Sequence, residues 1–186
     1  FRGAGLSGLK GMEFTSYLSQ YSISIPLIRP LLVFSRQEIR NYCQQNQVPY
    51  IEDETNTDTR YDRNRMRYEL IPVLEAYHPA LKKVLLNNIK VLQADHEFIE
   101  SEVEKAWEIC YVKCSGEILS LELKNIQHLQ RGLRWNLLRK AVKTLNVNTR
   151  DFDLQALQRL DDLVMNELDF TVELTNHMVA QVHEGQ

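Results

Sequence analysis

Three arginines within five residues offer the clearest anion-binding chemistry in the sequence: Arg63, Arg65 and Arg67. A guanidinium group keeps its charge at every physiological pH, and its planar fork matches phosphate or carboxylate oxygens. In a helix that begins near Asp62, Arg63 and Arg67 stand at i and i+4 on one face, with Asn64 beside them. The motif predicts an anion clamp with Arg63, Asn64 and Arg67 as the active groups. The alternative is a solvated helix face whose arginines pair with neighbouring carboxylates.

Further candidate anion-binding groups lie upstream of this cluster. A glycine-rich loop at residues 2–11 could bring backbone N–H groups close to a phosphate, although a flexible segment explains it equally well. Preorganised donors of this kind contribute roughly 3 kcal/mol each to stabilising a developing charge. The candidates for a nucleotide pocket are Arg2, Gly3 and Gly5. The candidates for substrate contacts are Arg29, which precedes Pro30, and Asp53 with Asn56 in a turn-rich polar segment.

A second basic region is expected on a helix over residues 125–145. Arg131, Arg139 and Lys143 fall within about a third of a turn, and Arg134 and Lys140 flank them. Phosphate contacts with a nucleic acid would use such a face, so Arg131, Arg134, Arg139 and Lys143 are candidate substrate-binding residues. Ordinary solvation of a helix surface is the alternative.

Composition limits the classes of protein that fit. The 186 residues are 44% hydrophobic and carry 22 basic against 25 acidic side chains, so any nucleic-acid binding must come from local patches. No apolar run is long enough to span a membrane and no secretory leader is visible, so we expect a soluble cytoplasmic protein. Cys43, Cys110 and Cys114 are not paired in CxxC elements, which predicts reduced thiols and no metal site.

The elements expected to position these groups are mainly helices. Ser35 to Glu38 forms a capping-box pattern that begins a helix ending near Asn46, and a helix carrying the arginine cluster should break or bend at Pro72. Pro79 suits the first turn of the next helix, whose apolar seam runs from Leu85 to Cys110 and contains His96 as a packed residue rather than a ligand.

The remaining expected elements alternate between strands and helices. Extended segments are expected at residues 22–28 and 48–51. Gly116 should close the helical region, followed by one strand near 118–123. Thr149 or Asp151 should cap a last helix to Met165, and alternating apolar residues from Phe170 to Val182 predict a terminal β-hairpin. We expect a mainly α chain with short β segments, with domains at 1–77 and 78–186.

Self-contained catalytic motifs do not occur in the sequence, since GxSxG, HExxH, the Walker lysine loop and GxGxxG are all missing. The order of the candidate segments nevertheless resembles one family, the tRNA(Ile)-lysidine synthetases of the PP-loop superfamily. The matching pieces are Arg2-Gly3-Ala4-Gly5 through Gly11, Arg29-Pro30-Leu31-Leu32 with Arg36 and Glu38, Pro49 with Asp53, Thr55 and Asn56, Arg63-Asn64 with Arg67, and Ile71-Pro72.

The resemblance implies an enzyme that uses ATP and magnesium to adenylate the wobble cytidine of an isoleucine tRNA, after which free lysine displaces AMP to form lysidine. Arg63, Asn64 and Arg67 would then hold the activated nucleotide or its phosphate. Arg2 to Gly5 would border the nucleotide pocket, and Asp53 with Asn56 would fix the adjacent loop. The partners implied are isoleucine tRNA and lysine, and a homodimer is compatible with the sequence.

One part of the family pattern is absent from this chain: the Ser-Gly-Gly-x-Asp-Ser ATP loop, which lies upstream of the glycine-rich loop in the family. The resemblance therefore implies a fragment, inactive by itself, formed by the C-terminal tail of an α/β adenine-nucleotide-hydrolase-like PP-loop domain and a helical tRNA-contacting domain. A non-catalytic tRNA-binding module is the alternative. A tRNA-thiolating relative fits less well, because its chemistry usually needs reactive cysteines.

Overall fold

A computed structural model describes residues 5–17, 25–145, 152–166, 171–175 and 178–182 of the chain. Those residues are mostly helical with short strands, as expected from the sequence, and the strands pair into two-stranded antiparallel sheets. The chain divides into two compact units, residues 1–93 (unit 1) and 94–186 (unit 2), which are described separately below. This division lies inside a helix, and the domain limits expected at 77 and 78 stay a prediction.

Unit 1 begins with the short helix α1 (Leu6–Leu9), followed by strands β1 (Thr15–Tyr17) and β2 (Pro26–Ile28). The two strands pair with Thr15 opposite Ile28. The expected extended segment at 22–28 is thus confirmed at its end, and residues 22–24 lie outside the described part. Gly11 between α1 and β1 has a φ of 73°, a conformation that disfavours residues with a side chain.

The capping box at Ser35 is confirmed. Helix α2 (Arg36–Gln45) follows the 3₁₀ turn η2 (Pro30–Val33), and the Ser35 hydroxyl accepts from the Glu38 N–H at 3.2 Å. The Glu38 carboxylate accepts in return from the Ser35 N–H at 2.7 Å. Both bonds satisfy donors that a helix N-terminus otherwise leaves free, which explains why the helix begins here.

The arginine cluster lies on a helical stretch with an irregular middle. After the 3₁₀ turn η3 (Glu54–Thr57), helix α3 (Asp62–Arg65) leads into a π-helical segment η4 (Met66–Leu70), and α4 (Ile71–Tyr77) completes the stretch. Pro72 was expected to break or bend the helix. Regular α-helix is interrupted just before it by the π segment, and Pro72 stands in the first turn of α4, while helical structure continues to Tyr77. The wider π turn immediately before Pro72 gives its ring room and removes the need for its missing N–H.

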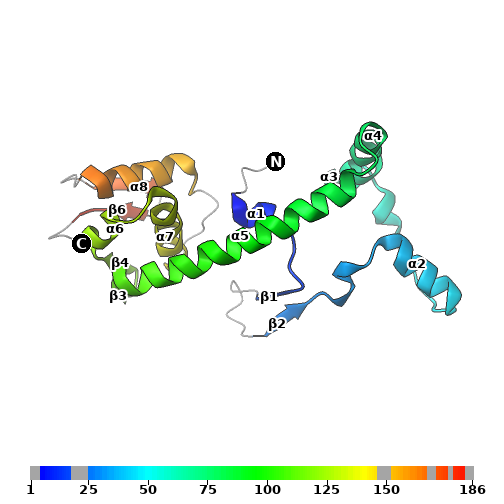
Figure 1. The fold of residues 1–186 in the computed structure, drawn as a ribbon, viewed down its shortest axis with the longest axis horizontal. Helices are drawn as coiled ribbons and strands as arrows, with labels where there is room; N and C mark the ends of the chain where they lie inside the picture. The colour runs from blue at the N-terminus through cyan, green and yellow to red at the C-terminus, as the bar shows by residue number, and fades with distance from the viewer. Residues whose placement is uncertain (1–4, 18–24, 146–151, 167–170, 176–177, 183–186) are drawn as a thin grey trace. The chain divides into compact units, whose positions relative to one another are not determined.

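Helix α5 (Leu81–Cys110) is a single helix of 30 residues, drawn in green in Figure 1. Pro79 lies two residues before it, in the turn that follows His78, and not in its first turn as expected. The predicted apolar seam is present, and Val103, Ala106 and Cys110 are buried along it. His96 is mostly buried and contacts Glu100 at 3.4 Å, which agrees with the packed role expected for it.

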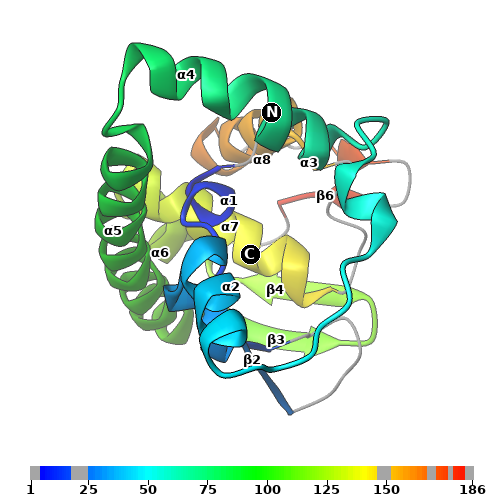
Figure 2. The same ribbon diagram turned by 90° about the vertical axis from the view of Figure 1, so that its right-hand side faces the viewer.

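A hairpin follows α5 directly, where only one strand was expected. Strands β3 (Tyr111–Ser115) and β4 (Ile118–Leu121) pair antiparallel and lie side by side in Figure 2. The helix ends at Cys110 because the next residues pair with β4. Gly116 therefore belongs to the hairpin turn, with a φ of 60°. Cys110 is the last residue of α5 and Cys114 lies on β3, so the two thiols do not share a helix.

The basic helix expected over 125–145 is two helices, α6 (Leu123–Gln127) and α7 (Arg131–Thr144). The break lets α6 bury Leu123 and Ile126, and the Gln127 side chain donates to the Val164 carbonyl of the next helix at 2.9 Å. That helix, α8 (Leu154–Asn166), begins after Asp153, whose carboxylate accepts from the Ala156 N–H at 2.8 Å. The caps expected at Thr149 or Asp151 lie outside the described residues.

The terminal hairpin is confirmed as β5 (Val172–Thr175) paired antiparallel with β6 (Met178–Ala180). Val172, Leu174 and Met178 point into the core of unit 2, where they join buried residues of α5 to α8. The largest fully buried apolar side chains of this core are Leu137, Leu157, Leu163 and Cys110.

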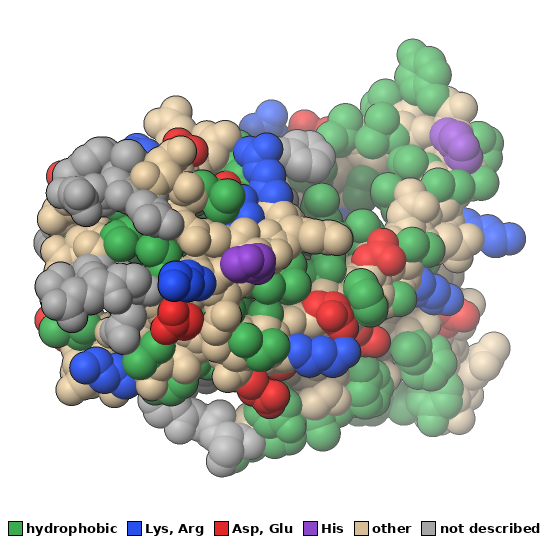
Figure 3. Space-filling model, turned by 60° about the vertical axis from the view of Figure 1, so that its left-hand side comes forward, with side chains coloured by type: hydrophobic (Ala, Val, Ile, Leu, Met, Phe, Trp, Pro, Cys, Tyr) green, Lys and Arg blue, Asp and Glu red, His purple; other side chains and the backbone are tan. Residues whose placement is uncertain are grey.

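Burial differs sharply between the units. Every buried apolar residue in the described ranges comes from position 103 or later, and Asn64 is the one buried residue among those described in unit 1. Unit 1 instead exposes apolar side chains such as Leu31, Val33 and Leu74. On the face drawn in Figure 3, hydrophobic side chains alternate with both basic and acidic ones.

Candidate anion-binding site

The three clustered arginines have different surroundings. Arg65 approaches the carboxylates of Asp62 at 4.0 Å and Glu69 at 3.8 Å, so it follows the solvated-face alternative. Arg63 is exposed and lies over the Tyr61 ring, 5.2 Å from its centroid. Arg67 is exposed and forms no ion pair within the described ranges. The two arginines predicted to act together are thus the two that are not held by carboxylates.

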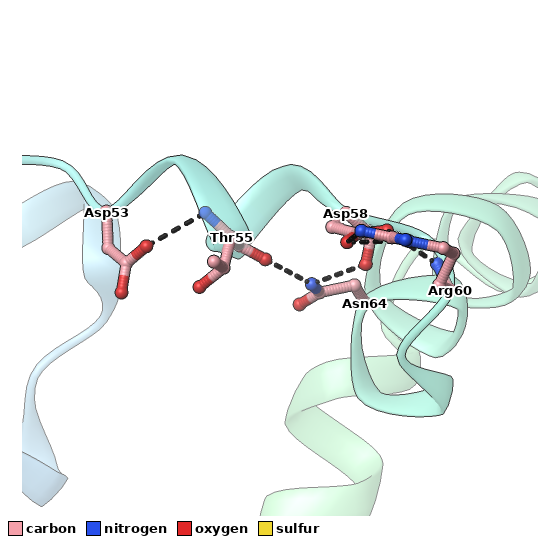
Figure 4. Close-up of polar contacts among 5 residues, drawn as sticks. All are labelled: Asp53, Thr55, Asp58, Arg60 and Asn64. Atoms are coloured by element: carbon pink, nitrogen blue, oxygen red, sulfur yellow. Dashed lines mark hydrogen bonds and ion pairs between the residues drawn. The ribbon is translucent and has the colours of Figure 1, made fainter.

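Asn64 between them has a structural role that the sequence did not reveal. Its side chain is 1% exposed, and its Nδ2 donates to the Thr55 carbonyl at 2.9 Å and to the Asp58 carbonyl at 2.8 Å. Figure 4 shows these bonds reaching from α3 to the preceding loop. The predicted site residues Arg63 and Asn64 therefore stand directly beside the polar segment that contains Asp53 and Asn56.

Asp53 caps the 3₁₀ turn of that segment. Its carboxylate accepts from the Thr55 N–H at 2.8 Å, and its carbonyl accepts from the Asn56 N–H at 3.0 Å. Hydrogen bonds from the Thr55 side chain and backbone hold the pKa of Asp53 below its usual value, and the positive charge of Arg63 acts in the same direction. Asp53 is thus an anion at neutral pH, placed within electrostatic reach of Arg63.

Arg60 and Asp58 belong to this region but were not among the candidates. The Asp58 carboxylate accepts from the Arg60 N–H at 3.0 Å and pairs with its guanidinium at 2.7 Å. The side-chain and backbone bonds from Arg60 lower the pKa of Asp58. The sequence signal for this pair is the two-residue spacing between Asp58 and Arg60, which is typical of an Asx turn.

The other candidates of unit 1 are separate or outside the described residues. Arg29 donates to the Glu13 carbonyl at 3.1 Å and to the Ser16 hydroxyl at 2.9 Å, so its guanidinium fastens β2 to β1. Gly5 precedes α1, and its carbonyl accepts from the Gly8 and Leu9 N–H groups. Arg2 and Gly3 lie outside the described part of the chain.

The basic candidates of unit 2 divide into exposed and internally paired groups. Arg139 and Lys143 are exposed and make no ion pair with any described residue, while Arg131 stacks over Trp135 at 4.5 Å. Lys140 pairs with Glu104 and lies 4.8 Å from the centre of the Trp107 ring. Arg131, Arg139 and Lys143 are therefore available to a ligand, whereas Lys140 is held by Glu104.

Arg134 is buried and faces the protein interior. Its Nε contacts the Asp161 carboxylate at 2.5 Å, and its Nη1 donates to the Leu129 carbonyl at 2.9 Å. Burial would raise the pKa of Asp161, but Arg134, Trp135 and the charge of Arg131 together lower it. Among the described residues, the indole N–H of Trp135 has no hydrogen-bond partner of regular geometry, so Arg134 is the main group that lowers the pKa of Asp161.

Within the described ranges, no group of three His, Cys, Asp or Glu side chains is arranged to hold a metal ion. Cys43, Cys110 and Cys114 are free thiols, as expected, and burial raises the pKa of Cys110. None of the described helices is both long and apolar enough to cross a membrane.

Comparison with known proteins assigns the residues around α3 to a known domain family. A family model described as the PP-loop domain matches residues 1–74. The tRNA(Ile)-lysidine synthase of Nostoc sp. is 30% identical over 164 residues, which cover 82% of this chain and 47% of the relative. The chain is a homologue of the tRNA(Ile)-lysidine synthases.

Two further lysidine synthases give the same result. The enzyme of Neisseria gonorrhoeae is 43% identical over 102 residues, covering 55% of this chain and 22% of the relative. That of Geobacter sulfurreducens is 30% identical over 168 residues, covering 89% of this chain and 34% of the relative. The chain thus spans less than half the length of these relatives. The PP-loop domain at 1–74 contains the whole arginine cluster and the segment fastened to it.

Proposed function

We propose that this chain is part of an enzyme that ligates lysine to the wobble cytidine of an isoleucine tRNA, with ATP as the activating substrate. The observation that carries the proposal is the pair of exposed guanidinium groups, Arg63 and Arg67, next to a polar segment fastened to the same helix. The PP-loop match over the same residues and the names of the relatives support it.

The reaction requires stabilisation of negative charge on phosphate. Adenylation of the base joins it to the α-phosphate and releases pyrophosphate, and the lysine amine then displaces AMP. Arg63 and Arg67 supply permanent positive charge for the phosphate oxygens in both steps. Asp53 and Asn56 support the polar segment that lies beside these arginines.

Magnesium is implied by the family resemblance, but the described residues offer no cluster of carboxylates suited to it. We therefore assign no step to a metal bound by these side chains.

The proposed organisation places the C-terminal part of the PP-loop domain at residues 1–77 and a helical tRNA-contacting domain with a terminal hairpin at 78–186. The exposed apolar side chains of unit 1 support the assignment of residues 1–77 to part of a PP-loop domain, because a complete α/β domain would bury them. On this proposal the 186 residues alone are inactive, and the reaction takes place in the cytoplasm with tRNA and free lysine. The homodimer stays a prediction.

The test uses the product of the complete reading frame that encodes this chain. It is incubated with ATP, labelled lysine and an isoleucine tRNA transcript carrying cytidine at the wobble position. We expect ATP-dependent incorporation of label into the anticodon loop and none into a transcript with uridine at that position. Absence of label in the cytidine transcript would refute the proposal.

A second candidate, a tRNA-binding module without catalysis, is favoured by one observation in unit 2. Arg131, Arg139 and Lys143 are exposed on α7, a helix anchored in a well-formed core. Mobility shifts with tRNA should then show binding that weakens steeply with salt, as phosphate contacts require. Binding by the Arg139→Ala/Lys143→Ala variant with an unchanged salt slope would rule out this face.

A further inference from the structure

The segment before the arginine cluster is held to α3 by one amide side chain. Asn64 donates both protons of its Nδ2 to backbone carbonyls, of Thr55 at 2.9 Å and of Asp58 at 2.8 Å. Thr55 lies within η3 and Asp58 directly follows it, nine and six residues before Asn64 in the sequence. We call Asn64 with the two carbonyls the loop lock (Figure 4).

The orientation of the amide is fixed by its partners. Turning the group over would set Oδ1 against two carbonyl oxygens, which repel it, so Nδ2 must face them. Its Oδ1 is buried and accepts no hydrogen bond within the described structure. A buried acceptor without a donor costs free energy, so the two bonds that Nδ2 donates have to offset that cost.

Local bonds stiffen the segment at both ends of the loop lock. Asp53 accepts from the Thr55 N–H at 2.8 Å, and Asp58 pairs with Arg60 through backbone and side chain. Figure 4 shows these contacts as one continuous row from Asp53 to Arg60. Releasing Asn64 would therefore remove both side-chain bonds between the segment and α3, while the Tyr61 N–H still donates to the Asp58 carbonyl at 3.3 Å and each end keeps its own cap.

We infer that Asn64 is a positioning residue, which fixes residues 53–58 against Arg63, and not a group that touches substrate. The inference rests on the proposed function and deepens it. A side chain that is 1% exposed, with both donors occupied, has no free group to offer a phosphate. Its neighbour Arg63 is exposed and interacts electrostatically with Asp53 across the locked segment.

The structural arm of the test measures amide hydrogen exchange in the product of the complete reading frame. Asn64→Asp replaces the two donors by a carboxylate facing two carbonyls. We expect exchange at least tenfold faster at the amides of Asn56 and Asp58, whose backbone bonds lie inside the segment, with the core of unit 2 unchanged. Asn46→Asp is the matched control, because Asn46 donates a single exposed bond to the Tyr42 carbonyl, and it should alter these rates less than twofold.

The functional arm compares lysidine formation by Asn64→Ala, Asp53→Ala and the double variant. If Asn64 acts through the segment, Asn64→Ala lowers kcat/KM at least tenfold, and adding Asp53→Ala to it lowers kcat/KM less than twofold further. Asp53→Ala alone should lower kcat/KM several-fold, which makes the coupling measurable.

Each of the following results would overturn the loop lock: unchanged exchange in Asn64→Asp, full activity in Asn64→Ala, or losses that multiply in the double variant. The unit 2 core serves as the internal reference for folding, so general unfolding of Asn64→Asp, seen as fast exchange there too, also counts against a local lock. If the unaltered enzyme forms no lysidine, the proposed function fails, and the exchange rates alone decide the loop lock.

Discussion

At the scale of single residues, the arginine cluster shows how spacing and environment separate neighbouring side chains of one type. Arg65 is held near two carboxylates, while Arg63 and Arg67 are exposed without such partners among the described residues. Exposed ion pairs contribute little stability, so removing any of the three should leave the fold intact.

We therefore expect Arg63→Ala and Arg67→Ala each to lower kcat for lysidine formation at least 100-fold, about 3 kcal/mol of lost charge stabilisation, with Tm changed by less than about 2 °C. Arg65→Ala is the control and should retain near-normal kcat. Turnover and melting curves of the complete reading-frame product give both quantities. A loss of Tm that parallels the loss of turnover would favour a structural role for these arginines.

The buried pair of Arg134 and Asp161 predicts a pH dependence of stability. The folded-state pKa of Asp161 lies below its ordinary 3.8, so its contribution is fully present above that value and is lost as pH falls through the folded pKa. Asp161→Asn should therefore lower the free energy of unfolding at pH 6, by about 3 kcal/mol. The difference from the unaltered protein should shrink at pH 3.

Urea unfolding at the two pH values measures this difference. Asp162→Asn changes the adjacent, exposed carboxylate and should have a small effect at both. An equal loss at pH 6 and pH 3 in Asp161→Asn would contradict an ionised buried pair.

At the scale of elements, two glycines in unit 2 have opposite expected responses to the same substitution. Gly116 has a φ of 60°, while Gly132 lies in the first turn of α7, and a Cβ added at either meets nothing within 4 Å. Backbone conformation alone then decides the result. Gly116→Ala should destabilise unit 2 by about 1 kcal/mol, whereas Gly132→Ala should stabilise it by about 0.5–1 kcal/mol.

Thermal unfolding of the two variants beside the unaltered chain checks the sign of each change. Destabilisation by both alanines would mean that packing, and not φ, governs these sites.

Elements with strong local signals were predicted correctly from the sequence. The Ser35 capping box, the apolar seam of α5 and the alternation of the last hairpin are each set by residues close in sequence. The errors arose where partners are distant. Strand β3 exists because it pairs with β4, and α6 separates from α7 because Leu123 and Ile126 pack in a core completed by α8.

The same distinction applies to the site. The spacing of Arg63 and Arg67 was visible in the sequence, but the burial of Arg134 beside Asp161 depends on a residue 27 positions away. The bonds from Asn64 to two carbonyls depend on how the preceding loop folds back, which side-chain types alone do not reveal.

At the scale of the whole molecule, the described apolar core belongs to unit 2. Leu157→Ala, at a site with no exposed surface, should lower the free energy of unfolding by about 2–5 kcal/mol. Leu74→Ala is the matched truncation in unit 1, where the side chain is 41% exposed, and should cost less than about 1 kcal/mol. Urea unfolding measures both, and equal losses would show that unit 1 has a comparable core.

This uneven burial has a consequence for biosynthesis. All the described core residues lie at or beyond position 103, so residues 1–93 emerge from the ribosome before the core of unit 2 exists. At roughly 5–20 residues per second, translation of the following 93 residues takes on the order of 5–20 seconds. Unit 1 therefore has to fold during that interval without any contribution from the core of unit 2.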